Sequence, residues 1–173
     1  MLPPLSRVFE ICLYSLLNFF PFLIFALYPF LDDLRFSRTK TGLLIVVLTF
    51  LQILFGLLAC FSTGNISAVL SLISTLSYAF FYFTVIRKSP GQLLFVLLMI
   101  SNIANLVVIT AKCLEGQFFP DFALLPYRYS MSLFMVIVEI FILIPVFIFL
   151  KKVITPAISC SQSFHEWRYL WLI

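Results

Sequence analysis

Hydrophobic positions along the chain gather into five long stretches, separated by short segments that hold most of the charged residues. The stretches are Val8–Leu31, Gly42–Phe61, Ile66–Ile86, Leu93–Cys113 and Met131–Leu150. At about 1.5 Å per helical residue, each is about long enough to cross a hydrocarbon core of about 30 Å. The pattern predicts an all-α fold, a polytopic bundle of transmembrane helices. A sixth span is expected to start at Trp167 and to continue past Ile173, so that residues 1–173 form the amino-terminal membrane region of a longer protein.

Composition agrees with this prediction and excludes several function classes. Hydrophobic residues make up 63% of the chain, charged residues 10%, and the mean hydropathy is +1.15, which is outside the range of a soluble domain. The cysteines have no CxxC spacing, and the single histidine, His165, lacks the second histidine of an HExxH zinc site. We find no GxSxG or Walker motif. We therefore expect no catalytic residue, metal site or cofactor in this segment.

The distribution of lysine and arginine predicts the orientation, because short cytoplasmic loops carry the excess of positive charge. Eight of these residues fall after the first, third and fifth spans: Arg35, Arg38, Lys40, Arg87, Lys88, Lys151, Lys152 and Arg168. Three fall on the other side: Arg7, Lys112 and Arg128. We expect the amino terminus to face outward. The net charge of +4 belongs to this bias and does not indicate a nucleic-acid partner. His165–Arg168 would form the cytoplasmic entrance to the sixth span.

Polar residues inside the spans are the candidate ligand-binding or switching residues. Glu139 is the most informative, because an ionisable group inside a span is costly and usually has a partner. At about 1.5 Å per residue, Glu139 and Asn105 both lie about 12 Å from the outer ends of their spans, so they are expected to pair. The candidates are Glu139, Asn105, Asn102, Gln52 and Asn18. Glu139, Asn105, Gln52, Asn18 and Ser74 are expected to form a polar layer near the middle of the membrane. Two interpretations stay open: structural adhesion between helices, and a ligand-sensing or switching network.

The third span carries a stripe of small polar residues on one helical face. Ser67, Ser71, Ser74 and Tyr78 recur at i, i+4, i+7 and i+11. Such a stripe lets helix backbones approach closely, and it can also form the wall of a polar cavity.

The segment Leu114–Ser130 is predicted to be the longest outward loop, and it is rich in apolar side chains. These are Phe118, Phe119, Phe122, Leu124, Leu125, Tyr127 and Tyr129. They are expected either to lie along the membrane interface, where aromatic residues are favoured, or to form the lip of a site for an apolar or peptidic ligand.

Several segments together resemble a known family. The span pattern, SNIAN (Ser101–Asn105), the FFPDFALLPYRYS loop and ITPAISCSQSFHEWRYLW (Ile154–Trp171) are similar to the membrane region of clostridial-type sensor histidine kinases with a carboxy-terminal GHKL-type ATPase domain. Their layout is that of peptide-pheromone receptor kinases. The resemblance implies a homodimer in the bacterial plasma membrane. It also implies a kinase domain beyond Ile173 that uses ATP and Mg²⁺ and acts on a response regulator.

We therefore expect the signal-sensing region of a two-component histidine kinase, without enzymatic activity of its own. A shift between two bundle packings, biased by an extracellular peptide or small apolar ligand, would carry the signal. Two alternatives remain: a small permease or transporter subunit with Glu139 as its coupling residue, and a membrane scaffold without a ligand.

Overall fold

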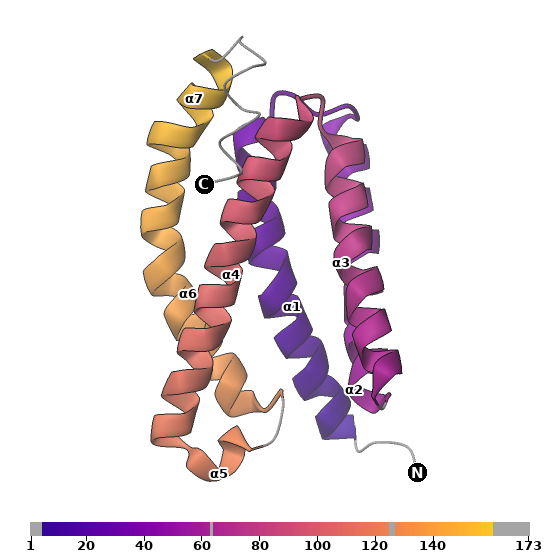
Figure 1. The fold of residues 1–173 in the computed structure, drawn as a ribbon, viewed down its shortest axis with the longest axis vertical. Helices are drawn as coiled ribbons and strands as arrows, with labels where there is room; N and C mark the ends of the chain where they lie inside the picture. The colour runs from indigo at the N-terminus through magenta and orange to yellow at the C-terminus, as the bar shows by residue number, and fades with distance from the viewer. Residues whose placement is uncertain (1–4, 63, 125–126, 161–173) are drawn as a thin grey trace.

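The computed structural model describes residues 5–62, 64–124 and 127–160 (Figure 1). Five long helices dominate it: α1 (Leu5–Leu27), α2 (Arg38–Phe61), α3 (Asn65–Val85), α4 (Pro90–Phe118) and α6 (Tyr129–Phe149). The short elements are η1 (Tyr28–Phe30), α5 (Pro120–Ala123), η2 (Leu150–Ile154) and α7 (Thr155–Cys160). Within these described ranges, five helices are long and apolar enough to cross a membrane. The predicted all-α fold with five complete spans is confirmed, and the chain is a multi-pass membrane protein. The predicted start of a sixth span, with His165–Arg168 before it, lies outside the described residues.

Long helices that follow one another in the sequence run in opposite directions through the bundle, so their connections lie at two distinct ends (Figure 1). The N-terminal end holds the start of α1, the α2–α3 turn and α5. The basic end holds the α1–α2 and α3–α4 connections, η2 and α7. The described basic residues at this second end are Arg35, Arg38, Lys40, Arg87, Lys88, Lys151 and Lys152. The lysine and arginine asymmetry seen in the sequence is therefore an asymmetry between the two ends of the bundle.

Two helices continue well beyond the C-terminal ends that the hydrophobic pattern predicted. Helix α4 ends at Phe118, so the predicted outward loop was wrong over Leu114–Phe118. Similarly, α6 continues through the π-helical turn η2 into α7, beyond the predicted end at Leu150. A hydrophobic stretch marks the part of a helix that is apolar. It does not mark where the backbone stops being helical, because charged residues continue a helix beyond the hydrocarbon core.

Helix α1 lies at the centre and packs against α2, α4 and α6, while α2 and α3 form a hairpin that touches α4 much less. The Tyr82 hydroxyl of α3 is fully buried and donates a hydrogen bond to the carbonyl of Ala26 in α1 at 3.1 Å. Large apolar side chains such as Phe80 and Phe141 stay 75% exposed around the outside, as expected for surfaces in contact with lipid.

At the basic end, the α1–α2 and α3–α4 connections pair with each other. Leu34 and Ile86 form an antiparallel bridge. Beside it, the Arg87 amide donates to the Asp33 carbonyl at 2.8 Å, and the Lys88 ammonium lies 3.3 Å from the Asp33 carboxylate. The α2–α3 hairpin is thereby fastened at this end to the segments around α1 and α4.

Candidate functional site

Polar side chains occupy one face on each of three helices near the middle of the bundle. Tyr14, Ser15 and Asn18 of α1 follow helical spacing, as do Ser101 and Asn105 of α4. On α3 the set is Ser71, Ser74, Thr75 and Tyr78, at i, i+3, i+4 and i+7. The spacing of each set directs its side chains to one side, and all three sets border the same space.

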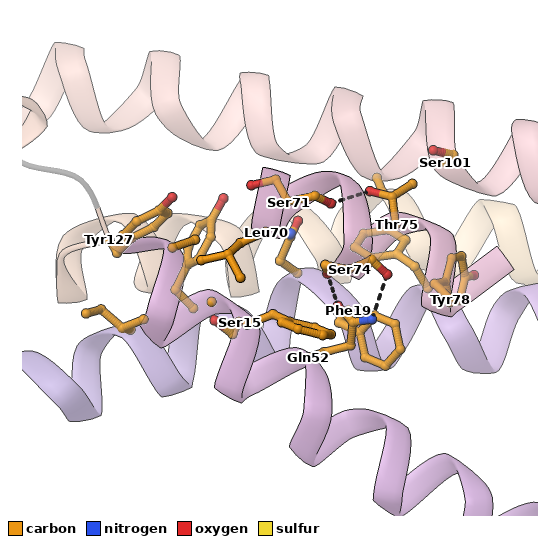
Figure 2. A pocket seen from close by; sticks show the side chains of 18 of the residues that line it. Ser15, Phe19, Gln52, Leu70, Ser71, Ser74, Thr75, Tyr78, Ser101 and Tyr127 are labelled. Carbon is orange, nitrogen blue, oxygen red and sulfur yellow. Dashed lines mark hydrogen bonds between the residues drawn. The ribbon is translucent and has the colours of Figure 1, made fainter. Parts of the chain in front are cut away.

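This space is a cavity of about 360 Å³ between α1, α2, α3 and α4 (Figure 2). Hydroxyl and amide groups share its wall with apolar groups. The lining residues are Ile11, Tyr14, Ser15, Asn18, Phe19, Phe22, Gln52, Phe55, Gly56, Ala59, Leu70, Ser71, Ser74, Thr75, Tyr78, Ile100, Ser101, Ala104, Asn105 and Tyr127. None of these lining residues, all within the described part of the chain, carries a charge.

Gln52 joins the two helices of the α2–α3 hairpin at the cavity (Figure 2). Its amide nitrogen donates to the Ser74 carbonyl at 3.0 Å and to the Ser77 hydroxyl at 3.1 Å. Its amide oxygen accepts a hydrogen bond from the Ser74 hydroxyl. Gln52 is 8% exposed, and these bonds satisfy an amide that would be costly to bury alone.

The serine stripe of α3 belongs to the cavity wall for most of its length. Ser71, Ser74 and Tyr78 line the cavity, whereas Ser67 does not. Ser74 also takes part in helix contact through Gln52. Of the two interpretations, the structure favours the cavity wall.

Three of the predicted polar residues, Asn18, Gln52 and Asn105, meet around the cavity, but two do not. Asn102 is exposed on α4 and does not line it. Glu139 is 6% exposed, and its Oε1 atom has no hydrogen-bond partner among the described residues.

The predicted pair between Glu139 and Asn105 is therefore wrong. Asn105 lies two residues before Val107, which is fully buried, so the two side chains point to nearly opposite sides of α4. Asn105 faces the cavity, while α6 packs on α1 and α4 and is not among the helices that enclose the cavity. Two side chains must lie at the same depth to pair, but equal depth does not determine the direction in which each side chain points.

Two buried carboxylates at the N-terminal end were not predicted as functional or paired groups. Glu10 is 4% exposed and lies 2.8 Å from the Arg7 guanidinium and 3.6 Å from that of Arg128. Glu115 is fully buried, 2.8 Å from the Lys112 ammonium, and accepts a hydrogen bond from the Ser130 hydroxyl. Arg7–Glu10 and Lys112–Glu115 are opposite charges at i, i+3, and this spacing was the available signal.

The aromatic loop residues divide between two places. Tyr127 lines the cavity at the N-terminal end, and its ring lies 4.6 Å from that of Tyr14. Phe119, Phe122 and Tyr129 line a separate apolar groove of about 480 Å³ beside α1 and α6. Tyr127 is thus at the cavity, as in the second interpretation of the loop, whereas Phe119, Phe122 and Tyr129 lie at the apolar groove. Leu125 lies outside the described residues.

The cavity can hold an uncharged ligand by hydrogen bonds and ring contacts. Within the described residues, no group of three or more histidine, cysteine or acidic residues could hold a metal ion. In comparisons with known proteins, the chain matches no family model, no curated protein and no solved structure.

Proposed function

We propose that this chain is a membrane-embedded sensor, in which a ligand bound in the cavity shifts the packing of the helices around it. The observation that carries the proposal is the cavity itself. Hydroxyl and amide groups from four helices converge near mid-bundle on a space in the size range of small-molecule sites. Following the resemblance of the sequence, the sensor serves a bacterial two-component histidine kinase.

The α2–α3 hairpin is the element proposed to move. Gln52 holds α2 and α3 together, so the hairpin shifts as a unit, while α3 packs only lightly on α4. A ligand that touches both α3 and α4 binds one spacing of these helices better, and it shifts the equilibrium by that difference in affinity. The paired connections at the basic end then transmit the shift towards the cytoplasm.

The proposed orientation places the basic end in the cytoplasm and the amino terminus outside the cell, following the positive-inside rule. Ser89→Cys, at the start of the α4 helix, should then react with impermeant thiol reagents only from the cytoplasm. Ser62→Cys, at the end of α2, should react only from outside. The reverse pattern of labelling would invert the topology.

The remaining parts of the proposal concern the longer protein that the resemblance implies. Its kinase domain would use ATP and Mg²⁺, form a homodimer and act on a response regulator, whereas the membrane region would supply no catalytic group. Sequencing the gene beyond the codon for Ile173 tests this directly: glycine-rich ATP-binding boxes support it, and their absence opposes it.

The sensor proposal is tested by measuring the distance between α3 and α4. Spin labels are attached at Leu72 and Leu98, which are 59% and 41% exposed, in lipid nanodiscs. A ligand from a panel of uncharged solutes and short peptides should shift the distance distribution and raise the melting temperature. Asn105→Leu should abolish both effects. Accumulation of the ligand inside proteoliposomes would instead identify a transporter, and a panel without any effect would support a scaffold.

A further inference from the structure

Aromatic ring contacts lie at the two ends of the cavity along the bundle. At the N-terminal end, Tyr127 packs on Tyr14, and the Arg7 guanidinium donates to the Tyr127 carbonyl at 3.4 Å. At the other end, the Tyr78 ring packs edge-on against Phe19, with centroids 5.4 Å apart. Figure 2 shows Tyr127 and Tyr78 at opposite ends of the group of lining side chains.

The side of the cavity between α3 and α4 is open. Ser71 and Thr75 of α3 and Ser101 and Asn105 of α4 line the cavity and are nevertheless exposed. Since α3 and α4 make few contacts, the two helices stand apart along this side (Figure 1). In a bilayer, this opening faces lipid near the middle of the spans.

Two amide groups of the cavity, one of them in this opening, lack partners. Among the described residues, the side chains of Asn18 and Asn105 make no hydrogen bond to another part of the chain, and both line the cavity. Amides left unpaired at this depth are costly, because the hydrocarbon core offers them no hydrogen bonds. An occupant that brings donors and acceptors would remove this cost.

The charges of the bundle indicate that the occupant is uncharged. None of the described residues that line the cavity is charged. The charged clusters at the N-terminal end, Glu10 with Arg7 and Arg128 and Glu115 with Lys112, consist of residues that do not line the cavity. A charged headgroup would lose its water in the cavity without gaining a counter-ion from the lining residues.

We propose that the cavity binds the headgroup of an uncharged amphiphile that enters from the bilayer between α3 and α4. Its hydroxyl or amide groups bond to Asn18, Asn105 and the hydroxyls of α3, and its chain extends through the opening into lipid. This inference rests on the proposed function of the cavity and names the class of ligand for it.

The test measures access to the cavity with a cysteine in the opening. The natural cysteines are replaced by alanine at Cys12, Cys60, Cys113 and Cys160. In this background, the labelling rate of Ser101→Cys measures access to the cavity. Leu106→Cys, 54% exposed on the same helix and not a lining residue, is the matched control. Both are labelled in phosphatidylcholine nanodiscs with a bilayer-soluble maleimide. The probes are monooleoylglycerol, the anionic oleoyl lysophosphatidylglycerol and free glycerol.

Monooleoylglycerol should slow the labelling of Ser101→Cys by about tenfold at about ten times its dissociation constant, and should leave Leu106→Cys unchanged. Lysophosphatidylglycerol and glycerol should have little effect. Equal protection by the anionic lipid would overturn the uncharged class. Protection by glycerol alone would overturn entry from the bilayer but keep a ligand-binding cavity. If no probe protects and the α3–α4 distance also responds to no ligand, both the inference and the sensor proposal fail.

A second substitution tests the role of the amide. Asn105→Leu, combined with Ser101→Cys, should remove the protection by monooleoylglycerol while the cysteine still reacts at its unprotected rate. Asn105→Gln should restore part of the protection, because it keeps the donor and the acceptor. Full protection in the leucine variant would show that Asn105 does not bind the headgroup.

Discussion

Gln52 of α2 and Ser74 of α3 form two hydrogen bonds with each other across the hairpin. The Gln52 amide nitrogen donates to the Ser74 carbonyl at 3.0 Å, and the Ser74 hydroxyl donates to the Gln52 amide oxygen. One side chain thereby satisfies its own amide and fixes the register of two spans. The pair also forms part of the cavity wall, so the same two residues join the helices and line the cavity.

Gln52→Leu should loosen the hairpin. The substitution removes the bonds to Ser74 and Ser77, and hydrogen bonds between membrane helices contribute about 0.6 kcal/mol on average and about 1.7 kcal/mol at most. We expect the free energy of unfolding, measured by titration with a denaturing detergent, to fall by about 1–2 kcal/mol. Leu54→Ala, at a lipid-exposed site of the same helix, should change it by about 0.5 kcal/mol or less. If both variants lost the same free energy of unfolding, the Gln52 hydrogen bonds would not stabilise the hairpin.

Gly56→Ala should disturb the contact between α1 and α2. A methyl group at Gly56 would collide with the Ser15 hydroxyl, so we expect this variant to be about 1 kcal/mol less stable than Gly42→Ala in the same titration. Ser15→Ala should restore most of this loss in the double variant, because it removes the colliding oxygen. Gly42→Ala is the control: its new methyl group meets nothing within 4 Å, and alanine favours a helix. If the double variant were as unstable as Gly56→Ala alone, the loss would not come from a collision with the Ser15 hydroxyl.

Glu115→Ala should be far more destabilising than the loss of an exposed acidic partner. It leaves Lys112 and Ser130 without their buried carboxylate. We expect about 2–3 kcal/mol, below the cost of breaking a fully buried pair because Lys112 is 43% exposed. The pair of Asp32 and Arg38, 3.5 Å apart with side chains 95% and 83% exposed, provides the comparison. Asp32→Ala should change the free energy of unfolding by about 0.5 kcal/mol or less. A similar small effect of Glu115→Ala would mean that the buried pair contributes little.

Glu139→Met should be at least as stable as the natural chain. The Oε1 atom of Glu139 is buried without a partner among the described residues, and removing an unsatisfied polar group recovers about 1 kcal/mol. Glu139→Gln, which keeps a polar group at the same place, should lie near the natural chain. Thermal unfolding in detergent micelles measures both. A marked loss of stability in Glu139→Met would reveal a partner for the carboxyl group.

Hydrophobic and charged residues along the chain were enough to predict the fold class, the five complete spans and the charge asymmetry between the two ends. Each follows from a property that is local to a segment, because transfer to hydrocarbon and helical hydrogen bonding depend on about 20 consecutive residues and not on their neighbours in space. Helical spacing also grouped Ser71, Ser74 and Tyr78 correctly on one face, before any partner helix was known.

Which helix faces meet became known from the packing of the bundle. Depth along a span is a one-dimensional quantity, so it aligned Glu139 with Asn105 without revealing that Asn105 points to the cavity and that α6 lies outside it. The same holds for Glu10 and Glu115: their i, i+3 partners are visible in the sequence. Their contacts with Arg128 and Ser130, however, form only because the start of α6 packs beside α1 and α4. The rotation of each helix about its axis is set by packing with several neighbours at once, and no single segment contains that information.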